Sequence, residues 1–117
     1  MQDHRNLTIW REGIELAKLF YSLTSNFPKS ENEILVHQIR KAVIAIPSNI
    51  AAGVSKGSDK DFYAFLENAL SFAYELDTYL LLSFELNYLD SKDYDKLLQK
   101  LNEEREMIHF FMGKLQG

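Results

Sequence analysis

The sequence has no cysteine, and it has little glycine, proline, valine or threonine. Its 117 residues include 5 Gly, 2 Pro, 3 Val and 3 Thr, against 17 Leu. The absence of cysteine excludes disulfide bonds, thiol nucleophiles and cysteine-ligated zinc or iron–sulfur sites. Because β-strands favour β-branched residues and their turns use glycine and proline, this composition predicts an all-helical domain.

The sequence also lacks a hydrophobic run long enough to cross a membrane. Its most apolar stretch, residues 79–84, falls far short of the ~20 residues that a membrane span needs. Residues 1–6 show no apolar signal-peptide core. With 46% hydrophobic and 26% charged residues, we expect one globular domain over residues 1–117, in a bacterial-type cytoplasmic protein without a membrane partner.

Positive charge is absent from one segment of the chain. Residues 61–90 carry six acidic residues and no Lys or Arg, whereas residues 29–60 carry five basic and three acidic residues. The net charge of −4 provides no general attraction to nucleic acid. The two segments instead predict an ion pair between Arg40 and Glu75, either within one chain or between subunits.

Three breaks divide the chain into predicted helices. Pro28 ends the first helix, and Ser30 with Glu33 forms a capping-box pattern for the second. Residues 53–58 form the second break and residues 87–91 the third, each with Ser or Asp placed to cap the helix that follows. The predicted helices span about 7–26, 31–55, 59–87 and 92–115.

Short connections make consecutive helices antiparallel. The predicted fold class is therefore all-α, an antiparallel up-down-up-down four-helix bundle. Pro47 lies within the second predicted helix, where it removes a backbone hydrogen bond, so we expect a kink there. The fourth predicted helix carries one apolar seam, which includes Leu97, Leu101, Ile108 and Met112.

The first and third predicted helices carry more apolar surface than one bundle core needs. We therefore expect a homo-oligomer whose subunits meet through these two helices. A tightly packed monomer is the alternative. The residues expected at the interface are Leu7, Trp10, Ile14, Phe62, Phe65, Phe72 and Tyr79.

No sequence motif predicts catalysis. Glu106 and His109 form one Glu-x-x-His, but a di-metal site in a bundle needs two such motifs. Residues 53–58 contain the residue types of a phosphate-binding loop in the wrong order and after a helix, which leaves at most a weak anion site at the start of the third helix. We expect no catalytic residue, no metal and no cofactor, and hence no enzyme.

Several motifs together resemble one protein family. Gln38-Ile39-Arg40-Lys41-Ala42, followed by residues 46–53 (Ile-Pro-Ser-Asn-Ile-Ala-Ala-Gly), resembles a signature of the four-helix bundle proteins encoded in 23S rRNA intervening sequences. Residues 7–10, 27–28, 62–66 and 75–78 resemble further motifs of that family in the same order. Ala52 stands where the family usually has Glu.

The resemblance implies a bundle that assembles into a ring, with a homopentamer as the expected assembly, and a relationship in fold to the accessory proteins of diversity-generating retroelements. The function expected from it is a non-enzymatic oligomeric protein, an RNA- or protein-binding scaffold. The alternative is a nucleic-acid-binding accessory subunit. The basic residues that a ring would bring together as candidate nucleic-acid contacts are Arg5, Arg11, Lys18, Lys41, Lys56 and Lys60.

Overall fold

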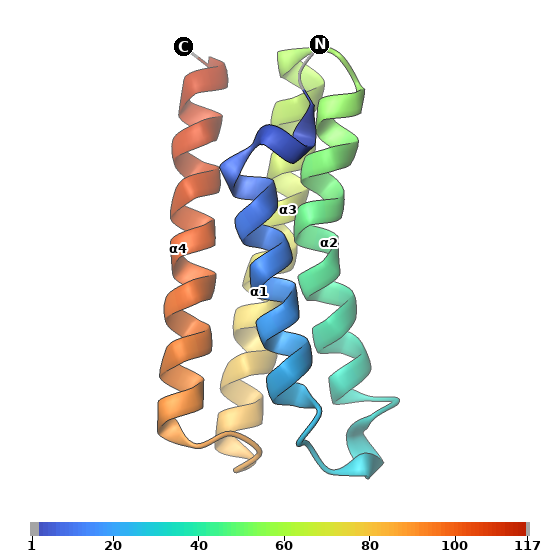
Figure 1. The fold of residues 1–117 in the computed structure, drawn as a ribbon, viewed down its shortest axis with the longest axis vertical. Coiled ribbons are helices and arrows are strands. Elements are labelled where there is room, and N and C mark those ends of the chain that lie inside the picture. The colour runs from blue at the N-terminus through green and yellow to red at the C-terminus, as the bar shows by residue number, and fades with distance from the viewer. Residues whose placement is uncertain (1–2, 117) are drawn as a thin grey trace.

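The computed structural model describes residues 3–116, which form four α-helices and two short 3-10 turns (Figure 1). This part of the chain contains no β-strand, so the predicted all-α class with four helices is confirmed. Within the same residues, none of the helices is both long and apolar enough to cross a membrane. The helices are α1 (Thr8–Thr24), α2 (Leu35–Ser55), α3 (Asp59–Glu85) and α4 (Ser91–Gln116), and the 3-10 turns are His4–Asn6 and Lys29–Glu31.

The helices form one elongated bundle of 44 × 23 × 20 Å. Figure 1 shows each helix running along the long axis in the direction opposite to the helix before it. α1 packs against α2 and α4, and α3 packs against the same two helices, but α1 and α3 are not neighbours. α1 and α3 therefore occupy opposite corners of the bundle, and their outer surfaces face in opposite directions.

Side chains cap the last two helices as predicted. The Ser58 hydroxyl accepts a hydrogen bond from the Asp61 backbone N–H at 3.2 Å, and the Asp90 carboxylate accepts one from the Asp93 N–H at 2.8 Å. The α3–α4 turn contains Asn87 in the left-handed conformation, with φ 64°. Asn tolerates this conformation, and the Tyr88 N–H then bonds to the Ser83 carbonyl in the manner of a Schellman motif.

The predicted start of α2 is wrong. Ser30 does not cap this helix, because Lys29–Glu31 form a 3-10 turn and α2 begins only at Leu35, without a side-chain cap. A long-range contact holds this turn in place: the Tyr88 hydroxyl donates a hydrogen bond to the Glu31 carboxylate at 2.7 Å. Phe27, which is buried, packs beside the same tyrosine ring.

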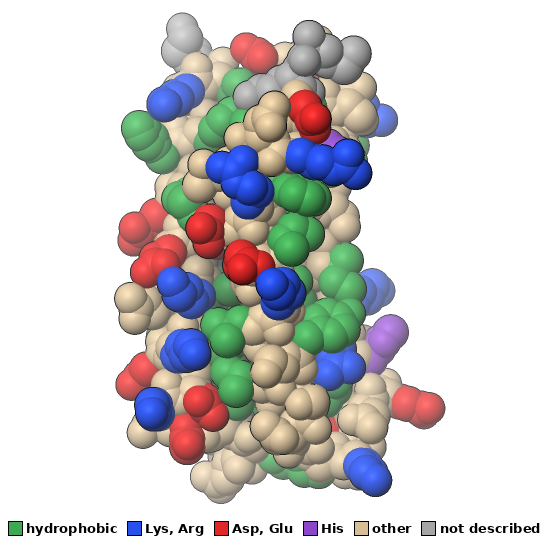
Figure 2. Space-filling view, viewed as in Figure 1, with side chains coloured by type: hydrophobic (Ala, Val, Ile, Leu, Met, Phe, Trp, Pro, Cys, Tyr) green, Lys and Arg blue, Asp and Glu red, His purple; other side chains and the backbone are tan. Residues whose placement is uncertain are grey.

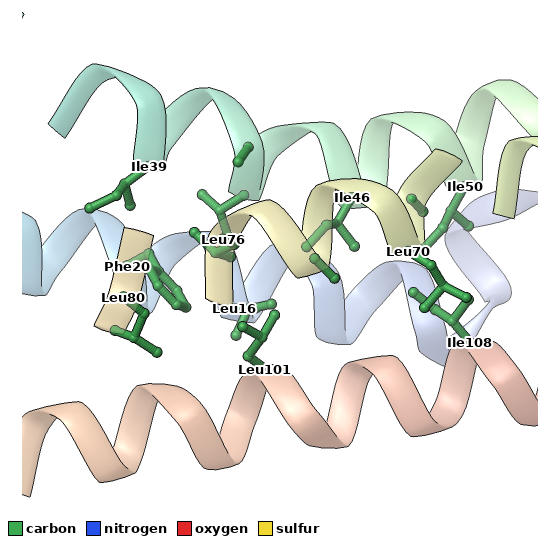
Figure 3. Close-up of a cluster of buried hydrophobic side chains, with 14 of the residues drawn as sticks. Leu16, Phe20, Ile39, Ile46, Ile50, Leu70, Leu76, Leu80, Leu101 and Ile108 are labelled. Atoms are coloured by element: carbon green, nitrogen blue, oxygen red, sulfur yellow. The ribbon is translucent and has the colours of Figure 1, made fainter. Parts of the chain in front are cut away.

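The core is formed by aliphatic side chains that all four helices direct inward (Figure 3). Pro47 is buried within α2, which continues on both sides of it; a kink at this residue stays a prediction. Asn49 donates a side-chain hydrogen bond to the Ala45 carbonyl at 2.7 Å in the same region. Core residues that carry labels in Figure 3 are Leu16, Phe20, Ile39, Ile46, Ile50, Leu70, Leu76, Leu80, Leu101 and Ile108.

α2 and α3 approach closely at Gly53. A Cβ atom at this position would lie 2.8 Å from Phe62 Cδ1 and 2.8 Å from Phe65 Cβ. We expect Gly53→Ala to lower the free energy of unfolding by about 1–3 kcal/mol, because the helices must move apart. The matched control is Gly113→Ala in α4, which meets no atom within 4 Å and should gain about 0.5–1 kcal/mol from helix propensity. Urea denaturation measures both, and equal stability of the two variants would contradict this packing.

Candidate functional site

A patch of apolar side chains lies in the solvent-exposed seam between α1 and α2 (Figure 2). Ile14 is 36% exposed, Tyr21 38% and Ile44 43%, and the half-buried Ala17 lies between them in the same shallow groove. We call these four residues the front patch. Such exposed apolar side chains, grouped rather than scattered, are typical of a surface that another protein covers.

A second group of exposed apolar side chains is spread over the outer surface of α3. Tyr74 is 56% exposed, Leu81 47%, Leu82 45% and Leu86 45%. These four residues, which we call the α3 patch, lie on the second half of α3 and at its end. Because α1 and α3 occupy opposite corners, the α3 patch lies away from Ile14, Ala17 and Tyr21 of the front patch, whereas Ile44 lies on α2, which neighbours α3.

The structure places two of the seven predicted interface residues in the core. Leu7 and Phe62 are 6% and 5% exposed and belong to the core, so their assignment to an interface is wrong. Trp10, Phe72 and Tyr79 are half-buried and pack against that core. The reason is that neighbouring helices cover a wider arc of α1 and α3 than a single helical face suggests.

The two remaining predicted interface residues, Phe65 and Ile14, differ in exposure. Phe65 is half-buried against Gly53, with the Lys56 ammonium 5.4 Å from its ring centre. Ile14 alone among the seven predicted residues is classed as exposed.

Arg40 and Glu75 do not pair within the chain. Arg40 donates to the Tyr21 carbonyl and to the Thr24 hydroxyl, each at 3.2 Å, and its guanidinium lies 4.5 Å from the Tyr21 ring centre. Glu75 accepts a hydrogen bond from the Tyr79 hydroxyl on its own helix. The intramolecular form of the predicted pair is therefore wrong, since Arg40 instead closes the carboxyl end of α1; the form between subunits stays a prediction.

The acidic α3 finds its basic partner on α4. Arg105 donates to the Asp77 carboxylate at 2.9 Å, and its guanidinium lies 4.9 Å from the Tyr74 ring centre. This ion pair is partly buried, with 14% of the arginine side chain exposed. This ion pair joins α4 to α3, whereas the charge pattern of the sequence predicted that α2 would supply the basic partner of α3.

The six candidate nucleic-acid contacts do not form one basic surface. Arg11 donates to the Arg5 carbonyl at 3.1 Å, which holds two arginines together at the start of α1, the end of the bundle that also carries the α2–α3 turn (Figure 1). Lys18 lies further along α1 and pairs with Glu15 at 3.1 Å. The others are exposed: Lys41 on α2, and Lys56 and Lys60 beside the α2–α3 turn.

The weak motifs of the sequence gain no support. Glu106 and His109 are both exposed on α4. Among residues 3–116, no group of three or more His, Asp or Glu side chains is arranged to hold a metal ion. Gly57, with φ 80°, closes the turn after α2 by adopting a conformation that favours glycine. The helix break predicted at residues 53–58 is confirmed at residues 56–58, since α2 continues to Ser55.

Sequence reasoning missed Glu104, which is 1% exposed and has no hydrogen-bond partner on either carboxyl oxygen. It lies on α4, three residues after Leu101 and four before Ile108, and so occupies a position of the apolar seam. That register is the signal that could have found it. The Glu104 carboxyl lies against the backbone of Gly13: a Cβ atom added to Gly13 would be 3.1 Å from Glu104 Oε2 and 3.2 Å from the Pro47 side chain.

Burial and charge both disfavour ionisation of this carboxyl. Burial, and after it the nearby Glu12 carboxylate, raises the pKa of Glu104 to about 8. Glu104 also lines a groove of about 930 Å³ between α1 and α4. A buried carboxyl with a raised pKa beside a groove is a feature that functional sites share, although structural positions produce it too.

Comparisons with known proteins agree with the fold. A family model described as 23S rRNA-intervening sequence protein matches residues 5–110. None of the curated proteins matches this chain. A crystal structure of a protein with unknown function from the S23 ribosomal protein family of Bacteroides thetaiotaomicron is similar in fold, with a TM-score of 0.80 at 20% identity, covering 90% of this chain and 98% of that chain. Because the family match spans nearly the whole sequence, the chain belongs to the 23S rRNA-intervening sequence protein family.

Proposed function

We propose that this protein is a non-enzymatic building block that assembles with copies of itself, the front patch of one copy packing on the α3 patch of the next. The observation that supports this proposal is the presence of two different groups of exposed apolar side chains, one between α1 and α2 and the other on α3. A monomer would leave both patches in contact with water, and covering them provides the driving force for association.

The placement of the patches favours a ring over a two-fold dimer. A two-fold dimer uses the same surface on both subunits, whereas contacts between two different surfaces run head to tail and close into a ring when the rotation allows. The family resemblance makes five the expected number of subunits. In such a ring the Arg40 of one copy and the Glu75 of another remain candidates for an ion pair between subunits.

The solution mass tests the proposal. The chain has a mass of 13.6 kDa, and we expect sedimentation or light scattering at low micromolar concentration to give one species at a whole multiple of it, five being the expected multiple. A mass of 13.6 kDa under these conditions would refute the assembly. A solution that contains only a dimer, with twice the mass of the chain, would refute the head-to-tail ring.

A nucleic-acid-binding role stays a prediction, as does a cytoplasmic location. In one chain the six basic residues are spread from the turn before α1 to the middle of that helix, over α2 and its end, and over the start of α3. A ring would repeat the neighbouring Arg5 and Arg11 once per subunit, which is how such a role would arise. A gel shift with structured RNA at ~50 mM salt, where phosphate contacts are strongest, tests it; an absence of binding there would exclude it.

A further inference from the structure

We propose that the pocket where α1 ends and α2 begins binds a phosphate monoester, whose phosphate group accepts hydrogen bonds from Arg40, Lys41 and His37. The pocket is formed by a single chain, so this proposal does not rest on assembly. The ligand class follows from the charge of the pocket, from an arginine that is held in place without an acidic partner, and from the apolar side chains beside it.

The pocket has the size of a small-molecule site. It lies between Tyr21 and Ser25 at the end of α1, Asn32 before α2, and the first half of α2. Its volume of about 750 Å³ lies within the range of ligand pockets in proteins. Figure 2 shows a histidine together with Lys or Arg and apolar side chains at the lower right, where α2 begins. A phosphate group alone would fill only part of this volume, so the ligand carries a further group.

The charged side chains of this pocket are all basic. His37, Arg40 and Lys41 line it, and among residues 3–116 no Asp or Glu does. Because these three residues are three and four positions apart on α2, they share one face of the helix. None of the three takes part in an ion pair within the described part of the chain. The protein therefore leaves their charge to be neutralised by an anion from outside.

The Arg40 guanidinium is held in place before any ligand arrives. Its Nε donates to the Thr24 hydroxyl and its Nη2 to the Tyr21 carbonyl, each at 3.2 Å, and the group lies 4.5 Å from the Tyr21 ring centre. These two bonds leave the other terminal nitrogen, Nη1, free to donate to a ligand. Charge-assisted hydrogen bonds to phosphate are strong, and a guanidinium that is already fixed loses less conformational freedom on binding.

A phosphate monoester fits these donors better than a carboxylate does. It carries close to two negative charges at pH 7 and three strong acceptor oxygens, whereas a carboxylate has one charge and two oxygens. Besides the guanidinium, Lys41 offers an ammonium group, and the His37 imidazole has an N–H in either protonation state. Val36, Ile44 and the Tyr21 ring line the same pocket and provide apolar surface for the group that the phosphate esterifies.

The probe for the test is phenyl phosphate, with benzoate and inorganic phosphate as matched compounds that lack the phosphate and the ring. Titration followed by protein NMR at pH 7 and ~50 mM salt, where charge interactions are weakly screened, should show one phenyl phosphate per chain. It should bind at least about tenfold more tightly than benzoate and more tightly than inorganic phosphate. The largest shifts should lie in residues 36–44.

Two variants test the named donors. Lys41→Gln, at an exposed position, should weaken phenyl phosphate binding about tenfold. Arg40→Lys keeps the charge but loses the planar fork, and should weaken binding to a similar degree. Since Arg40 also closes the end of α1, Lys41→Gln decides the matter if Arg40→Lys unfolds. The matched control is Lys92→Gln, the same change at an exposed position outside the pocket, which should leave the affinity unchanged.

Several results would overturn the proposal. These are equal binding of benzoate and phenyl phosphate, unchanged affinity in Lys41→Gln, or no phenyl phosphate binding at ~10 mM. A single-stranded RNA without a terminal phosphate offers only phosphodiesters and should not displace phenyl phosphate. Displacement by this RNA would assign the pocket to nucleic acid instead.

A further variant separates this site from the assembly. Tyr21 and Ile44 belong both to the pocket and to the front patch, which the next copy covers in the proposed assembly. Leu82→Asp disrupts the α3 patch and leaves the pocket intact, so it should bind phenyl phosphate at least as tightly as the wild type. Absence of binding in both proteins would refute the ligand site alone, and a wild type that binds phenyl phosphate as a monomer would refute the assembly alone.

Discussion

Raising the pH from about 5 to about 8.5 is expected to destabilise the wild-type protein by on the order of 3–5 kcal/mol relative to Glu104→Gln. In the unfolded chain the Glu104 carboxyl ionises near its ordinary pKa of 4.5, whereas burial, together with Glu12, holds it protonated in the folded protein until about pH 8. Between these values the unfolded state releases a proton that the folded state keeps. The stability that this group contributes is therefore complete below pH 4.5 and is lost as the pH rises to 8.

The measurement is urea denaturation of both proteins across this pH range. At pH 5 the two should be equally stable within about 1 kcal/mol, since both then bury a neutral side chain without a partner. The matched control is Glu103→Gln, which changes an exposed carboxylate beside Lys100 and should retain the wild-type pH profile. Parallel profiles for wild type and Glu104→Gln would show that the carboxyl is not buried as described.

A single aspartate in either apolar patch is expected to abolish assembly. Ile44→Asp places a charge in the front patch and Leu82→Asp places one in the α3 patch; these side chains are 43% and 45% exposed in the single chain. Burying an unpaired charge in an interface costs several kcal/mol, which exceeds what one small apolar patch contributes. Sedimentation should therefore show monomers for both variants.

Folding of the two variants should change little, because both side chains face solvent in one chain. We expect the free energies of unfolding of the two monomeric variants to agree within about 1 kcal/mol. His109→Asp, an exposed position on α4 outside both patches, is the matched control and should retain the wild-type mass. If one aspartate variant keeps the full mass, its patch is not part of the interface.

The features that the sequence predicted correctly depend on local interactions. Ser58 and Asp90 cap helices through contacts three residues away, so the starts of α3 and α4 were predictable within one residue. The start of α2 was not, because the contact between Tyr88 and Glu31 joins residues 57 positions apart. No local pattern contains that contact.

The location of the exposed apolar surface was harder to predict than its existence. A helical projection shows which residues share a face, but it does not show which neighbouring helices cover that face. For this reason Leu7 and Phe62 were assigned to an interface although they lie in the core, whereas Leu82 and Ile44 were missed. Glu104 was hidden for a similar reason: its register was readable, but Gly13 and Pro47, which deny it a partner, lie on other helices.

Mixing the two patch variants tests the head-to-tail arrangement most directly. The α3 patch is intact in Ile44→Asp and the front patch is intact in Leu82→Asp, so one copy of each can still join through a single contact. We predict that the mixture forms a dimer of one copy of each, with twice the 13.6 kDa mass of either variant alone. A mixture that stays at 13.6 kDa, or dimers that form in either variant alone, would contradict assembly through these two surfaces.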